Sequence, residues 1–359
     1  MYSDEKRPRP ILIILLLGVV LIVLFLVFPE SLAPEITMEP QWYQAFDSAA
    51  SNDQLDAEDL VGFVSDRHFG YFAPDGSFAA LHTRDRPVAV NDAAWVQVPA
   101  APGESLRLRS RQGDPLAELP AGQQPFFSAG GLYAVSADSL TLHHYQPGGS
   151  LSWSYTLPSH VTAFASSPAL TVVGMIDGSI EAIDPTGSQT LRFLPGGSRL
   201  SAIYGVTVSD DGQYIACLSG LEPQRMLVLG KGEGGYRVIS HRYLETAFRT
   251  PSSLAILPDE PYVLYRDAGG IGVSTLDGTV LGVLPAAVDT FEVYPAHHHG
   301  IYYLFARQGE QVELISFKPP TRLLGRARLP DGVRFISVRD DVIYFSCAVG
   351  MARIQISER

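Results

Sequence analysis

The chain has 359 residues, a formal net charge of −12 and two cysteines. An acidic surface repels phosphates, which argues against a nucleic-acid partner, and two cysteines do not make a disulfide framework. A chain of this size that is rich in Gly, Pro, Tyr and Phe is long enough for one large all-β domain or two smaller ones.

Residues 11–28 (ILIILLLGVVLIVLFLVF) form an uninterrupted apolar run of 18 residues without a charge. As a helix this run would be about 27 Å long, close to the ~30 Å hydrocarbon core of a bilayer. Lys6, Arg7 and Arg9 precede the run and acidic residues follow it. We therefore expect a single-pass transmembrane helix with a cytoplasmic N-terminus and an extracytoplasmic, periplasmic C-terminal domain.

A cleaved signal peptide is the alternative interpretation of this segment. Ser31-Leu32-Ala33 resembles a small-x-small processing site. However, the apolar run is longer than the ~7–15 residues of a signal-peptide core, and Pro34 would directly follow the cut. We therefore favour a retained anchor.

Beyond the anchor, four short β-rich stretches recur along the chain. Between residues 161 and 194 they are VTAFAS, TVVGM, SIEAI and TLRFL, separated by turn sequences such as Asp177-Gly178 and Asp184-Pro-Thr-Gly, and a second unit follows directly. One four-stranded unit cannot bury both of its faces, whereas a ring of such units can. The pattern therefore predicts an all-β fold of the β-propeller type.

The position of the first hairpin turn in each unit predicts the number of blades. We place these turns at Gly76, Gly130, Ala169, Gly212, Glu260, His299 and Asp341. The first two are 54 residues apart and the others 39 to 48, against ~40–45 for a four-stranded blade. We therefore expect a seven-bladed propeller, with six or eight blades as alternatives.

The last unit supplies three strands and lacks a fourth. We expect the apolar stretch 60–64 (LVGFV) to pair with Arg353–Ile356 as the missing outer strand and so to close the ring. The predicted organisation is a cytoplasmic N-terminus (1–10), a transmembrane helix (11–28), a linker (29–54) and a β-propeller domain (55–359).

Two segments carry a family resemblance. LTLHHYQPGGSLSWSYTLP (140–158) and GMIDGSIEAIDPTGSQTLRF (174–193) resemble the repeats of PQQ-like and WD40-like β-propellers. The resemblance implies a platform that binds a ligand or a protein. A membrane-tethered, extracytoplasmic member would be similar in layout to the PQQ-like propeller lipoproteins that help to assemble outer-membrane proteins.

The candidate binding residues lie in the apparent excess of the first unit, between residues 83 and 104. Arg84, Arg86 and Trp95 are of the types enriched in binding hot spots, and we expect them to be accessible on one propeller face and to bind a partner. The alternative is a loop that only covers a blade edge.

We predict no catalytic, cofactor or metal site. The chain has no nucleophile elbow and no phosphate-binding loop, and His297-His298-His299 falls where a hairpin tip is expected. The sequence therefore predicts a non-enzymatic protein-interaction scaffold in the cell envelope. The alternative is a binder of a small molecule or carbohydrate, or an enzyme, that uses the central channel.

Overall fold

The computed structural model describes residues 18, 36–49, 59–101, 103–129, 131–297 and 300–358. These residues form eight antiparallel sheets and one short 3-10 helix, η1 (Phe46–Ser48). None of the helical residues among them belongs to a helix with the length and apolar character that crossing a membrane requires. The predicted transmembrane helix, residues 11–28, lies outside the described residues except for Gly18.

In the first four sheets, the strands follow one another in sequence order. The first sheet contains β2 (Val61–Val64), β3 (His68–Phe72) and β4 (Phe78–Thr83). The second contains β5 (Val88–Val90), β6 (Ala94–Gln97), β7 (Leu106–Ser110) and β8 (Pro115–Leu119). The third contains β9 (Gln123–Ser128), β10 (Gly131–Ser136), β11 (Thr141–Tyr145) and β12 (Leu151–Thr156). The fourth contains β13 (Val161–Ser166), β14 (Thr171–Met175), β15 (Ile180–Ile183) and β16 (Gln189–Phe193).

The last four sheets repeat this order, and the eighth also recruits a strand from the N-terminal part. The fifth contains β17 (Leu200–Val208), β18 (Tyr214–Leu221), β19 (Arg225–Gly232) and β20 (Gly235–Tyr243). The sixth contains β21 (Leu254–Ile256), β22 (Tyr262–Asp267), β23 (Gly270–Thr275) and β24 (Val280–Pro285). The seventh contains β25 (Thr290–Pro295), β26 (Tyr302–Gln308), β27 (Gln311–Lys318) and β28 (Arg322–Arg328). The eighth contains β29 (Ile336–Arg339), β30 (Val342–Ser346), β31 (Gly350–Glu358) and β1 (Ile36–Ala45).

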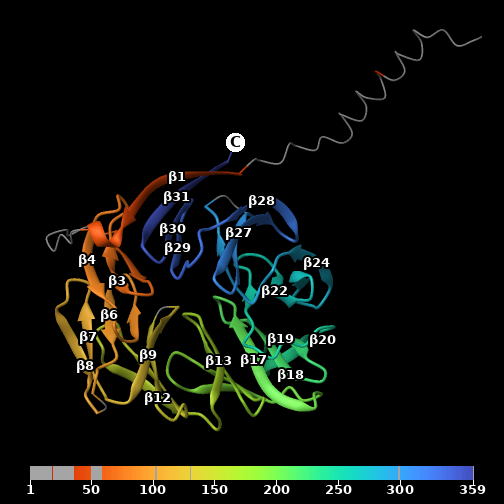
Figure 1. Cartoon of the computed structure of the whole chain (residues 1–359). Coiled ribbons are helices and arrows are strands. Elements are labelled where there is room, and N and C mark those ends of the chain that lie inside the picture. The colour runs from red at the N-terminus through yellow and green to blue at the C-terminus, as the bar shows by residue number, and fades with distance from the viewer. Residues whose placement is uncertain are drawn as a thin grey trace, which may run out of the picture.

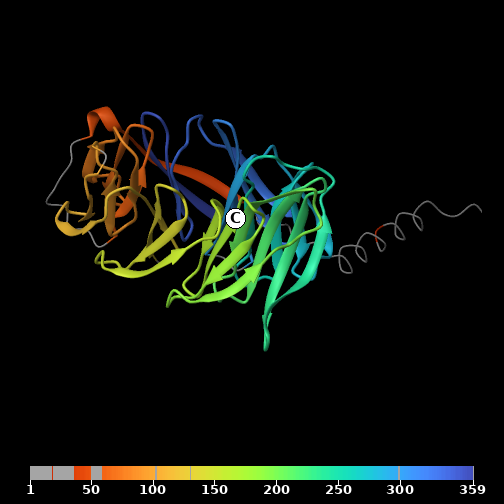
Figure 2. The same ribbon diagram turned by 90° about the horizontal axis from the view of Figure 1, so that it is seen from below.

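The eight sheets are arranged as the blades of a closed ring (Figure 1), and the view turned by 90° shows that the ring is flattened (Figure 2). Eight hydrophobic clusters each lie between two neighbouring sheets. Successive residues of a strand serve opposite faces, so Tyr71 packs towards the second sheet and Phe72 towards the eighth. Each sheet therefore buries both faces against its neighbours, which explains why a single unit would not be stable alone.

The first strands of neighbouring sheets contact one another. The Thr162 hydroxyl on β13 donates a hydrogen bond to the Ile203 carbonyl on β17 (2.7 Å). The hydroxyls of Ser128 on β9 and Ser166 on β13 are 2.8 Å apart. The first strands of these neighbouring sheets therefore lie innermost in the ring.

The expected number of seven blades is wrong, because the turn at Gly76 was taken as the first turn of its blade, whereas it joins the last two strands, β3 and β4. In the β2–β3 turn, Asp66 contacts Arg334, which precedes β29, and the carbonyl of Ser65 accepts a hydrogen bond from Arg84, which precedes β5. This turn therefore lies on the face of the ring at which the first strands of the blades begin. It follows that β2 runs in the direction of a second strand, and that Gly76 lies in the last turn of its blade.

The apparent insertion at residues 83–104 therefore has a different explanation. It contains β5 and β6, the first hairpin of a separate blade, with its turn at Asp92. The separation of 54 residues between Gly76 and Gly130 thus spans two blades at different points of the repeat. Eight blades, one of the two alternatives to seven, is the observed number.

Ring closure occurs in the predicted position but uses a different strand. β1 pairs with β31 in antiparallel register, from Ile36 opposite Glu358 to Ala45 opposite Gly350, and forms the outer edge of the eighth blade. In Figure 1 the red β1 lies along the blue β31. The predicted closing strand, 60–64, instead pairs with β3. Ten residues of the predicted linker 29–54 are therefore part of the propeller.

The misassignment of β1 has a local cause. Pro40 interrupts its alternation, and the register shifts between Pro40 and Trp42. A proline is tolerated there because an outer strand leaves one row of backbone N–H groups unpaired. Beyond the shift, the Trp42 indole N–H donates to the Pro74 carbonyl in the first blade (3.0 Å), so β1 joins the eighth blade to the first.

Candidate partner-binding groove

The structure places Trp95 on strand β6 of the second blade, where the sequence indicated an insertion in the first unit. Its ring centroid is 5.2 Å from that of Phe69 and 5.6 Å from that of His82, both in the first blade. The side chain is half-buried, and its indole nitrogen is buried with no hydrogen-bond acceptor among the described residues. Trp95 is thus less accessible than expected, because one face of its ring packs in the interface between the first two blades.

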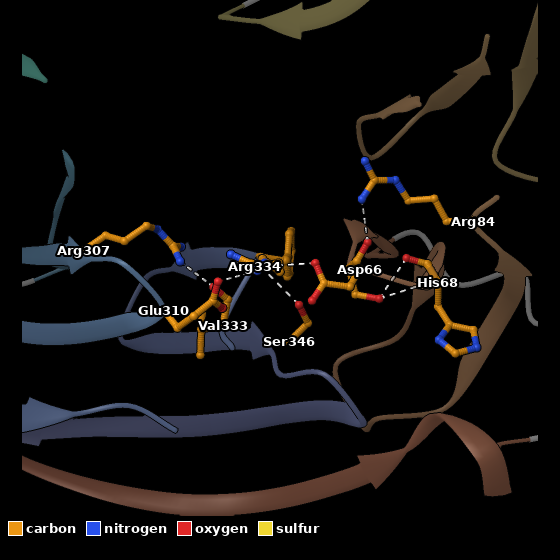
Figure 3. A network of polar contacts seen from close by, with 10 residues as sticks. Asp66, His68, Arg84, Arg307, Glu310, Val333, Arg334 and Ser346 are labelled. Atoms are coloured by element: carbon orange, nitrogen blue, oxygen red, sulfur yellow. Dashed lines mark hydrogen bonds and ion pairs between the residues drawn. The ribbon is translucent and has the colours of Figure 1, made fainter. Parts of the chain in front are cut away.

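Arg84 belongs to a polar network at the junction of the blades. Its guanidinium donates to the Ser65 carbonyl (3.0 Å). Figure 3 shows this contact beside Arg334, which bridges Glu310 of the seventh blade (2.9 Å) and Asp66 of the first (2.8 Å). The hydrogen bonds with Glu310 and Asp66 raise the pKa of the Arg334 guanidinium. This network links the blades around the closure point, and Arg84 contributes to it through its hydrogen bond to the backbone of Ser65.

Arg86 and Trp95 do come together, in a groove of about 530 Å³ on the second blade. We call it the blade-2 groove; it is lined by Arg86, Trp95, Gln97, Pro99, Glu104, Ser105, Arg107 and Arg109. The hydrophobic cluster beside the groove is contributed mainly by the first blade. Its fully buried members all come from the first blade or the residue before it, and the second blade adds only the half-buried Val90 and Trp95. The groove lies where the polar face of the second blade meets the first.

Two arginines of the groove were missed by the sequence analysis. Strand β7 alternates between leucine and arginine, and Leu106 and Leu108 are each 1 % exposed in the cluster shared with the third blade. Alternate residues of a strand point to opposite faces. Arg107 and Arg109 therefore line the opposite face, together with Trp95 and Gln97 of β6. The alternation of leucine and arginine in the sequence of β7 could have revealed these two arginines.

The charges of the groove are unequally neutralised. Asp85 forms an ion pair with Arg86 (3.2 Å) and accepts a hydrogen bond from Gln97 (2.9 Å), and the hydrogen bond with Arg86 lowers the pKa of the Asp85 carboxyl. Arg109 donates to the Gly113 carbonyl (2.8 Å) and lies over the Trp95 ring at 5.7 Å.

Arg107 is the least constrained of the three arginines. Its side chain is exposed and has no ion-pair partner within the described ranges, although Glu118 lies opposite it on β8. Glu104 is the one acidic residue of the groove lining. Two arginines without a carboxylate contact therefore face an open groove on a chain that is acidic as a whole.

The part of the chain that the structure describes contains no set of side chains that could coordinate a metal ion. No three His, Cys, Asp or Glu side chains there lie close enough to hold an ion. His297 is described and lies 3.6 Å from Asp340, while His298 and His299 lie outside the described residues. The prediction of a hairpin tip at this cluster is therefore tested only in part.

Comparison with known proteins places the chain among β-propellers. It is 24% identical over 300 residues to an uncharacterized protein of Treponema pallidum (strain Nichols), covering 83% of this chain and 79% of that protein. Its fold is similar to the crystal structure of BamB from Moraxella catarrhalis, with a TM-score of 0.57, 14% identity and coverage of 89% of this chain and 100% of BamB.

A designed protein shows the same architecture. The computationally designed Ika8 protein matches with a TM-score of 0.56 and 16% identity, over 84% of this chain and 98% of Ika8. At these identities the two structures show a shared fold and nothing finer. A family model described as beta-propeller protein matches residues 5–359, and the chain therefore belongs to this family of β-propeller proteins.

Proposed function

We propose that this chain is a membrane-tethered, extracytoplasmic β-propeller that acts as a non-enzymatic protein-interaction scaffold in the cell envelope. The observation that carries the proposal is the blade-2 groove. Tryptophan and arginine are the residue types most enriched in binding hot spots, and here they gather in one open groove on a rigid ring. A rigid scaffold that holds such side chains in place reduces the entropy lost on binding.

The apolar run at residues 11–28 supports the tethered location. It has the length of a bilayer-spanning helix and follows the basic residues Lys6, Arg7 and Arg9. The closing strand β1 begins at Ile36, only seven residues after Pro29. An anchor at 11–28 would therefore hold the propeller close to the membrane, with its rim at the eighth blade nearest to the tether.

The location is tested with reporter fusions to the full chain. A reporter active only in the cytoplasm should be active at the N-terminus and inactive after Arg359, because the run at residues 11–28 crosses the bilayer once. A C-terminal fusion that is active in the cytoplasm would contradict the proposed orientation. A mature chain that begins at Pro34 would show that the segment is a cleaved signal peptide and would contradict the tether.

A further inference from the structure

We propose that the blade-2 groove binds an acidic peptide segment of the partner in an extended conformation, an inference that rests on the proposed function. Its volume of about 530 Å³ is within the ~300–1,000 Å³ range of sites that enclose small ligands. It therefore accommodates a short run of side chains and not a whole domain. The partner contributes this segment, while the rigid second blade contributes the receiving surface.

The spacing of the two arginines favours an extended ligand. Arg107 and Arg109 are two residues apart on β7, so their Cα atoms are about 6.6 Å apart along the strand. Carboxylates at alternate positions of an extended peptide have the same spacing. A guanidinium binds a carboxylate with two parallel N–H donors, so each arginine can receive one carboxylate.

The charge of the rest of the molecule supports a protein segment over a lipid surface. The chain has a formal net charge of −12, and its first ten residues carry a net charge of +1. Residues 11–359 therefore carry a net charge of −13. An acidic body of this size is repelled by an anionic membrane or a polyphosphate, both of which present charge over a wide area. A narrow peptide reaches the local arginines without approaching the acidic remainder. Gln97 and Ser105 add hydrogen-bonding groups to the same lining.

The experiment measures fluorescence anisotropy of a labelled peptide against the full chain in detergent. The probe has about eight residues, ~26 Å when extended, with Glu at alternate positions separated by Ser, and the matched peptide has Gln in place of each Glu. We expect the Glu peptide to bind at least about tenfold more tightly than the Gln peptide, and this preference to fall as salt rises.

Two charge reversals locate the site. Arg107→Glu should weaken binding of the Glu peptide at least about tenfold, since it replaces an exposed attractive charge by a repulsive one. Arg322→Glu is the matched control, because Arg322 is also exposed but lies on β28 in the seventh blade, and it should change the affinity less than about twofold. Arg109→Gln is a second test, which removes the charge but keeps a polar side chain, and it should also weaken binding of the Glu peptide.

Three results would overturn the inference. They are equal binding of the Glu and Gln peptides, equal effects of Arg107→Glu and Arg322→Glu, and Arg107-dependent binding to phosphatidylglycerol vesicles in place of the peptide. The proposed scaffold function fails separately. If the chain still captures an envelope protein while the Glu peptide does not bind, the scaffold stands and the acidic-segment inference is wrong.

Discussion

Removing residues 1–45 should lower the free energy of unfolding of the propeller by more than about 3 kcal/mol, whereas removing residues 1–35 should change it by less than about 1 kcal/mol. The longer deletion removes β1, which pairs along the whole length of β31. It also removes Trp42, whose ring packs 6.2 Å from Phe72 and from Tyr344. Without β1, the eighth blade loses its outer strand and its contact with the first blade through Trp42, and the edge of β31 is exposed.

Urea denaturation of the two truncated chains gives this comparison directly. The chain that begins at Ile36 serves as the control, because it lacks the apolar run but retains the closing strand. If the chain that begins at Phe46 unfolds at the same urea concentration as the control, then β1 does not stabilise the ring and the closure described above is wrong.

Phe63→Ala should destabilise the propeller by about 3–5 kcal/mol, the usual cost of removing a fully buried aromatic ring. Phe63 is 1 % exposed and stands at the interface where the ring closes. Its centroid lies 5.7 Å from that of Phe46, 5.9 Å from Phe72 and 5.7 Å from Phe78. Phe335, which precedes β29 in the eighth blade, lies 6.3 Å from it. The substitution would leave a cavity that these four aromatic residues cannot fill.

Denaturation of the purified variants measures this loss. Leu194→Ala is the control, because this leucine is 64 % exposed and its truncation should change stability by less than about 0.5 kcal/mol. A Phe63→Ala variant as stable as the Leu194→Ala variant would contradict the packing of β2 at the interface between the first and eighth blades.

The fold class could be predicted from the sequence because turn chemistry repeats at regular intervals. The number of blades could not, because two different turns share that chemistry. In the last turn of the first blade, the Asp75 carboxylate accepts a hydrogen bond from the backbone N–H of Ser77 (2.9 Å). In the first turn of the fifth blade, Asp211 accepts one from the backbone N–H of Gln213 in the same way (2.9 Å). Such a signal shows that a chain reverses, but not which pair of strands the turn joins. Gly76 was therefore assigned to the wrong turn.

The candidate site, like the fold, could be predicted from the sequence only in part. Residue type alone pointed to Arg86 and Trp95, which do line one groove. Arg84 has the same type but lies in the network at the blade junction, and only the path of the backbone at Ser65 reveals this. Arg107 could have been found from the Leu-Arg alternation of β7, since Leu106 and Leu108 share one face of that strand.

The central claim, that the blade-2 groove contacts a protein in the envelope, is tested most directly by site-specific photocrosslinking of the full chain in intact cells. A photoreactive phenylalanine derivative replaces Ser105, which lines the groove beside the arginines, in one variant and Arg322, on β28 of the seventh blade, in another. We expect a discrete adduct with one polypeptide from position 105 and none from position 322. Identical adducts from both positions, or no adduct from position 105, would contradict the claim.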